Sequence, residues 1–136
     1  MTHYLFDTMV VSVGFNPRRH PGVATWLASD DVVGWFSTIT LGEIRRGIVV
    51  SERRQPALAG RLENWFEALL AEQADQFLPV STEIAEQWGR LSARLGRKDA
   101  DLLIAATAQV HGLIVATRNI QHFAPTGVAL FNPWGD

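Results

Sequence analysis

Short apolar runs alternate with longer amphipathic segments along most of this chain, and this alternation constrains the fold more than any other feature. Branched and aromatic residues in the short runs predict strands. Apolar residues three and four positions apart in the longer segments predict helices. The expected strands cover residues 3–6, 32–36, 77–80, 113–116 and 128–131, and the expected helices cover residues 23–28, 40–50, 56–70, 81–95 and 99–111. Such alternation is typical of an α/β fold with a mainly parallel central sheet.

Length and composition predict a single domain over residues 1–136. No apolar run approaches the roughly 20 residues of a membrane span, and the polar start with Asp7 argues against a secretory leader, so we expect no membrane partner. The absence of cysteine excludes thiolate chemistry and agrees with an expected location in a reducing cytoplasm. A net charge of −2 gives no overall attraction to nucleic acid, so binding would need a local basic patch or bridging cations.

Three acidic residues occupy positions where a folded domain has little structural use for them. Asp7 ends the first predicted strand, Glu43 lies beside the apolar stripe of the second predicted helix, and Asp101 begins D-L-L-I-A-A-T-A. Ile104 and Ala105 follow Asp101 at three and four residues, so its carboxylate continues the apolar stripe of its helix. Open α/β sheets gather such strand and helix ends at one edge, where ligands bind. We expect the three acids to meet there.

Each acid also has a purely structural interpretation. Asp101 is placed to complement a helix dipole, Asp7 to form a turn, and Glu43 to pair with a neighbouring arginine on its helix. Asp99 competes with Asp101, but it fits the N-cap position of that helix better. The joint placement of the three acids favours the functional interpretation.

Clustered carboxylates require a compensating cation. Two like charges about 4 Å apart repel by roughly 4 kcal/mol at an effective dielectric constant near 20. Oxygen ligands without cysteine favour Mg²⁺, with Mn²⁺ as a substitute. Such an ion activates water and stabilises the leaving oxygen at phosphorus. The expected reaction is phosphodiester hydrolysis, with Asp7, Glu43 and Asp101 as the metal ligands.

Hydroxyl and cationic side chains are expected around the three acids. We predict that Thr8, Arg46, Thr117 and Arg118 contact the substrate, because arginines and hydroxyls bind backbone phosphates. The four histidines show no metal-ligand spacing and are expected to be ordinary surface or packing residues. The apolar face around Trp65 is expected to be exposed and to bind a partner.

Several motifs, taken together and in order, resemble those of PIN-domain ribonucleases of the VapC toxin class. They are Y-L-F-D-T-M-V, S-T-I-T-L-G-E-I-R-R-G, D-L-L-I-A-A-T-A, V-A-T-R-N-I-Q-H-F and F-N-P-W. The resemblance spans nearly the whole chain. It implies a single PIN-like domain with an α/β/α sandwich and Mg²⁺-dependent endoribonuclease activity. It also implies homodimers and a cognate antitoxin that blocks the site. Asp7, Glu43 and Asp101 match the family's first, second and third acids, with Asp7 and Asp101 as the principal ligands.

Two departures from the family pattern bear on activity. Met9 replaces the asparagine of the usual D-T-N motif, which removes a polar side chain near the site. The loop after the last core strand lacks the usual acid and offers only Asn119 or His122 in its place. Asn119 can accept from a metal-bound water through its carbonyl oxygen. We therefore expect one well-occupied ion and modest activity.

These departures also support an alternative function. A catalytically weak or inactive PIN fold would act as an RNA- or antitoxin-binding module. A phosphoacceptor receiver domain would require an adjacent acid pair after the first strand and a lysine after the last core strand. This chain has Asp7-Thr8 and Thr117-Arg118 there. A nucleotide-binding Rossmann fold would require G-x-G-x-x-G, which is absent.

Overall fold

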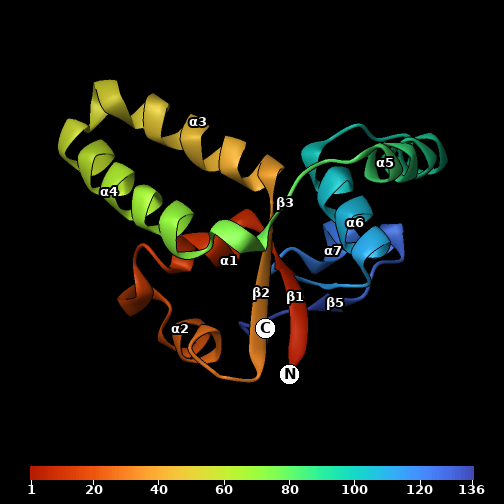
Figure 1. The fold of residues 1–136 in the computed structure, drawn as a ribbon, viewed down its shortest axis with the longest axis horizontal. Helices are drawn as coiled ribbons and strands as arrows, with labels where there is room; N and C mark the ends of the chain where they lie inside the picture. The colour runs from red at the N-terminus through yellow and green to blue at the C-terminus, as the bar shows by residue number, and fades with distance from the viewer.

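A five-stranded parallel sheet forms the centre of the protein, in a computed structural model that describes all 136 residues (Figure 1). The strand order is β3-β2-β1-β4-β5. The strands are β1 (Thr2–Phe6), β2 (Val32–Ser37), β3 (Phe77–Leu78), β4 (Ile114–Ala116) and β5 (Leu130–Phe131). The helices are α1 (Thr8–Val13), α2 (Pro21–Leu27), α3 (Thr38–Arg54), α4 (Pro56–Glu72), α5 (Thr82–Leu95), α6 (Ala100–His111) and α7 (Ile120–Phe123).

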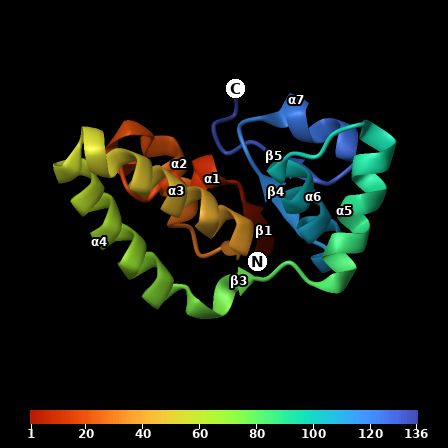
Figure 2. The same cartoon turned by 90° about the horizontal axis from the view of Figure 1, so that it is seen from above.

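Two hydrophobic cores lie on opposite faces of this sheet. Successive side chains of a strand point to opposite faces, so Leu5 of β1 joins one core while Tyr4 and Phe6 join the other. The core around Leu5 packs against α5 and α6. The core around Phe6 packs against α1, α3 and α4, and Figure 2 shows the two groups of helices on either side of the sheet. The expected α/β/α sandwich with a parallel sheet is therefore confirmed.

The carboxyl ends of β1, β2 and β4 meet at one edge of the sheet because the strands are parallel. Asp7 follows β1 directly and is the N-cap of α1, and Ser37 at the end of β2 caps α3 by accepting from the Ile39 N–H. Thr117 follows β4 at the same edge. Three helix or loop starts thus converge where sequence analysis places the site.

Tertiary packing produces elements that sequence analysis did not predict. Helix α1 begins directly after Asp7, although its valine-rich sequence has weak helix propensity. Its burial of Val10, Val11 and Val13 outweighs that preference. The strand expected over residues 77–80 is present but shorter, because β3 ends at Leu78 before Pro79, which has no N–H to continue a strand ladder.

The apolar face expected around Trp65 is only partly exposed, and Trp65 itself is half-buried at the wall of a groove. Phe66 beside it is buried in the core, and Trp65 packs edge-on against Phe15 with ring centroids 5.7 Å apart. None of the helices combines the length and apolar character needed to cross a membrane.

Candidate functional site

Asp7 is the most firmly held of the predicted acids. Its carboxylate accepts hydrogen bonds of 2.8 Å from the Thr8 backbone N–H and of 2.8 Å from the Thr117 hydroxyl. Burial raises the pKa of Asp7 above its ordinary value, although both hydrogen bonds and the nearby His122 oppose that rise. No arginine or lysine neutralises this carboxylate, so its negative charge remains uncompensated.

Glu43 reaches the same edge from the second turn of α3. The Thr8 hydroxyl donates a 2.9 Å hydrogen bond to Glu43 Oε1, which connects the start of α1 to α3. Arg45 does not pair with Glu43, because its guanidinium lies 2.7 Å from Glu63 and stacks over Phe66. The neutral hydroxyl of Thr8 therefore orients Glu43 without cancelling its charge.

Asp101 lies in the first turn of α6 with 25% of its side chain exposed. Burial is the main reason that its pKa rises to about 6, and the negative charges of Asp7, Asp99 and Glu43 raise it further. His122 acts in the opposite direction. The carboxylates are thus close enough to influence one another electrostatically, as expected of a site that binds a cation.

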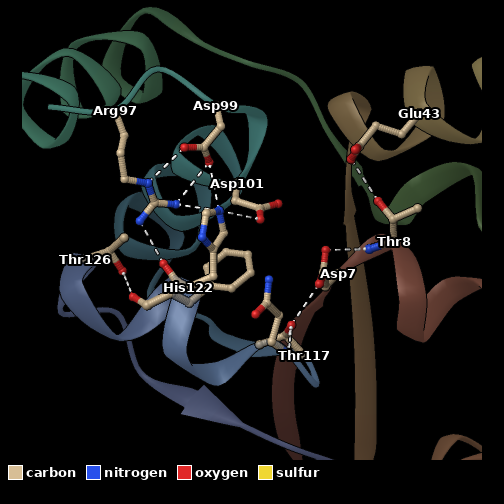
Figure 3. Close-up of polar contacts among 11 residues, drawn as sticks. Asp7, Thr8, Glu43, Arg97, Asp99, Asp101, Thr117, His122 and Thr126 are labelled. Atoms are coloured by element: carbon tan, nitrogen blue, oxygen red, sulfur yellow. Dashed lines mark hydrogen bonds and ion pairs between the residues drawn. The ribbon is translucent and has the colours of Figure 1, made fainter. Parts of the chain in front are cut away.

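The three predicted acids share one space but do not form a closed set of ligands. Figure 3 shows Asp7, Glu43 and Asp101 on different sides of a common space, at the ends of β1, α3 and α6. The one group of potential ligands whose atoms all lie within 4.8 Å is Asp99, Asp101 and His122. Unpaired carboxylates repel one another, which favours the wider spacing of the predicted set.

The cluster of Arg97, Asp99 and His122 is the part of the site that sequence analysis missed. Asp99 occupies the N-cap position of α6 as expected, but its side chain makes no capping hydrogen bond and instead pairs with Arg97 at 2.9 Å. This contact holds the pKa of Asp99 below its usual range. His122 is not an ordinary surface residue, because its Nε2 lies 3.2 Å from Asp101 Oδ2.

One sequence signal pointed toward this cluster. His122 stands in the loop where the resembling family carries a fourth acid, and the Asp99-x-Asp101 pair begins the helix that faces that loop. The four histidines share no metal-ligand spacing among themselves. The spacing between histidines cannot reveal a single histidine whose partners are aspartates from another element.

The structure separates the residues predicted to contact substrate into two groups. Thr117 is fully buried, and its hydroxyl donates to Asp7 and accepts from the Asn119 N–H, so it has no surface left for substrate. Thr8 is partly buried and donates to Glu43. Both threonines orient acids.

Arg46, Arg118 and Asn119 are exposed and remain available to a substrate. Arg46 forms no ion pair, whereas Arg118 lies 2.7 Å from Asp136 and 5.2 Å above the ring of Trp134. The side chain of Met9 is 50% exposed. The hydrogen bonds to Asp7 therefore form without a polar side chain at that position.

Comparison with known proteins decides the family. The model of the PIN domain matches residues 4–126. The chain belongs to the PIN domain family. It is 35% identical to the toxin FitB of Neisseria gonorrhoeae over 97% of this chain and 99% of that protein. It is also 29% identical to the VapC ribonuclease Y4jK of Sinorhizobium fredii over 96% of each protein.

Solved structures of toxin–antitoxin complexes share the PIN fold. FitAcB from Neisseria gonorrhoeae superimposes with a TM-score of 0.76 at 33% identity, over 96% of this chain and 98% of that one. A toxin–antitoxin complex from Klebsiella pneumoniae gives a TM-score of 0.67 at 28% identity, over 96% of this chain and 97% of that one. The family, the VapC relatives and the cluster of carboxylates support a nuclease with an acidic site suited to a metal ion.

Proposed function

We propose that this PIN-domain protein is the toxin of a toxin–antitoxin pair and hydrolyses phosphodiester bonds in RNA as a Mg²⁺-dependent endoribonuclease. Mn²⁺ substitutes for Mg²⁺. The observation that carries the proposal is the placement of Asp7, Glu43 and Asp101 around one space at the carboxyl edge of the sheet, with no arginine or lysine paired to any of them (Figure 3). Uncompensated carboxylates in a half-buried site favour a hard divalent cation, because the cation removes their mutual repulsion.

In this proposal Asp7 and Asp101 hold the ion directly. Glu43 and Asn119 contribute through water, which agrees with the wide spacing of the acids and with the several waters that Mg²⁺ usually retains. The bound ion supplies an activated water and stabilises the negative charge that develops at phosphorus. Thr117 and Thr8 fix the orientation of Asp7 and Glu43 through neutral hydrogen bonds.

We assign Arg46 and Arg118 to the substrate backbone. Arg118 exchanges its contact with Asp136 for a phosphate, since a guanidinium binds either anion with the same planar fork. Thr8 and Thr117 act on the acids and do not contact RNA. This changes the predicted role of the two threonines while keeping them at the site.

A cognate antitoxin and a second copy of the chain are the proposed protein partners, and the cytoplasm is the proposed location. The antitoxin proposal is supported by the similar structure from Klebsiella pneumoniae, which is described as a toxin–antitoxin complex, and by the relative described as toxin FitB, whose complex FitAB was solved bound to a DNA fragment. A groove lined by α1, α3 and α4 begins at Thr8 and Glu43 and extends to Trp65. An antitoxin segment in this groove would reach the acids.

RNA cleavage tests the enzymatic proposal. We expect cutting of a mixed RNA substrate with Mg²⁺ or Mn²⁺, and loss of cutting in EDTA. Asp101→Asn removes the charge while changing little volume, and Asp75→Asn at an exposed site is the matched control. Cleavage that persists in EDTA would disprove metal dependence.

The alternative is a catalytically weak or inactive PIN fold that binds RNA or antitoxin. Its support is the loss of two polar groups of the family pattern, because Met9 stands in place of the asparagine of D-T-N and the loop after β4 lacks the usual acid. This alternative predicts no cleavage with any metal and RNA binding that is unchanged in Asp101→Asn.

A further inference from the structure

Arg97 is the only permanently charged cation that contacts the cluster formed by Asp99, Asp101 and His122. It follows α5 directly after the left-handed C-cap Gly96 and is 22% exposed. Its Nε and Nη2 donate to the two oxygens of Asp99 at 2.9 and 3.1 Å, and its Nη1 donates to the backbone carbonyl of His122 at 2.8 Å (Figure 3). The guanidinium is therefore held rigidly by α6 and α7.

The same guanidinium faces a set of metal-ligand atoms. His122 Nε2 lies 2.7 Å from Arg97 Nη2, 3.2 Å from Asp101 Oδ2 and 3.3 Å from Asp99 Oδ1. A guanidinium can only donate, so in the neutral tautomer with its proton on Nδ1 the lone pair of His122 Nε2 accepts from Arg97. Two carboxylate oxygens and an imidazole lone pair, all within 4.8 Å, are a donor set for a divalent cation. Arg97 already supplies positive charge at this position.

We propose that Arg97 is a built-in cation that takes the place of a second metal ion and limits the centre to one ion. The inference rests on the proposed metal-dependent function and deepens it. A divalent ion beside His122 Nε2 would lie next to a fixed positive charge and would have to share Asp99 with it. Asp7 and Asp101 would hold the first ion, and neither carboxylate makes a hydrogen bond or an ion pair with the guanidinium.

A purely structural role for Arg97 makes a different prediction. Its contact with the His122 carbonyl also holds α7, so its loss lowers stability under either interpretation. Only the cation interpretation predicts a change in the number of metal ions bound. The number of ions per chain is therefore the measurement that distinguishes them.

The test is a titration of the metal-free full chain with Mn²⁺. Calorimetry and the electron paramagnetic resonance signal of free Mn²⁺ both measure the number of ions bound per chain during the titration. We expect one ion on the wild type and two on Arg97→Gln. Arg97→Lys keeps the positive charge and is expected to bind one ion. Arg97→Gln combined with His122→Ala removes a ligand of the opened site and is expected to return the count to one.

Two ions on the wild type or on Arg97→Lys would overturn the inference, as would a single ion on folded Arg97→Gln. Circular dichroism establishes that each variant is folded. If Arg97→Gln does not fold, Arg97→Met, which also lacks the charge but keeps an apolar stem, takes its place in the same titration and is expected to bind two ions. The absence of any bound ion on the wild type would instead overturn the proposed metal-dependent function, so the two failures differ.

Discussion

Asp7 and Glu43 at the sheet edge differ from Asp99, the N-cap residue of α6, in the kind of group that binds their carboxylates. Asp7 and Glu43 accept hydrogen bonds from the hydroxyls of Thr117 and Thr8, which are neutral. The carboxylate of Asp99 instead accepts hydrogen bonds from Nε and Nη2 of the Arg97 guanidinium, which is positively charged. The pKa of Asp7 is raised by burial, whereas the pKa of Asp99 is lowered by Arg97.

This difference shows how one residue type acquires two roles. A neutral donor fixes the direction of a carboxylate and leaves its charge available for a cation. A guanidinium fixes the direction and also cancels the charge. Asp101 is intermediate between these two cases, because the negative charge of Asp7 raises its pKa while His122 lowers it.

The largest expected effect is the difference in RNA cleavage between removing the charge of Asp101, which no arginine pairs with, and removing that of Asp99, which pairs with Arg97. Asp101→Asn should lower RNA cleavage by at least about 100-fold, because metal stabilisation of the transition state is worth several kcal/mol. Asp99→Asn should cost less, since its charge is already cancelled by Arg97. Single-turnover cleavage rates with Mg²⁺ provide the measurement. Equal losses in the two variants would contradict the distinction.

The neutral hydrogen bond to Asp7 should tune metal affinity. Thr117→Val removes the hydroxyl at nearly constant volume, and loss of such an orienting contact typically weakens metal binding about 10- to 100-fold. Thr117→Ser keeps the hydroxyl and should bind Mn²⁺ nearly as the wild type does. The dissociation constant from calorimetry is the readout. Unchanged affinity in Thr117→Val would show that the contact only supports packing.

The metal-free protein should lose stability as the pH rises. Folding raises the pKa of Asp101 from 3.8 to about 6, so the folded state binds this proton more tightly than the unfolded chain. The group therefore favours folding below about pH 4, and this contribution is lost as the pH passes through about 6.

Asp101→Asn should remove that loss. At pH 7.5 in EDTA its free energy of unfolding should exceed that of the wild type by up to about 3 kcal/mol, since one pKa unit corresponds to about 1.4 kcal/mol. Urea denaturation at pH 5 and pH 7.5 measures the difference. A variant less stable than the wild type at pH 7.5 would mean that the ionised carboxylate of Asp101 does not destabilise the metal-free folded state.

The smallest expected effect concerns the surface pair of Arg118 and Asp136. Asp136→Asn should strengthen single-stranded RNA binding a few-fold by freeing the guanidinium, whereas Arg118→Ala should weaken it. The slope of log K against log salt should fall by about 0.7 in Arg118→Ala, as for one lost phosphate contact. Fluorescence anisotropy at several salt concentrations tests both variants. Parallel changes in the two variants would exclude competition between Asp136 and phosphate.

The sequence by itself determined the layered fold and the position of the sheet edge. Strand and helix periodicities are local properties, so they predicted every strand of the sheet to within a few residues. Because parallel strands end together, the same pattern predicted that Asp7, Glu43 and Asp101 would share an edge. Helix α1 escaped prediction because its valines are stabilised there by burial, which local propensity does not contain.

Only the tertiary structure decided which acids keep their charge. Asp99 and Asp101 lie two residues apart in one sequence motif, yet Arg97 neutralises the first, while the second faces Asp7 from a different element. The partners of His122 and Thr117 likewise come from segments distant in the chain. Arg97 precedes Asp99 by only two residues, but its Nη1 also donates to the backbone carbonyl of His122, so the packing of α7 against the start of α6 helps to decide where the guanidinium lies.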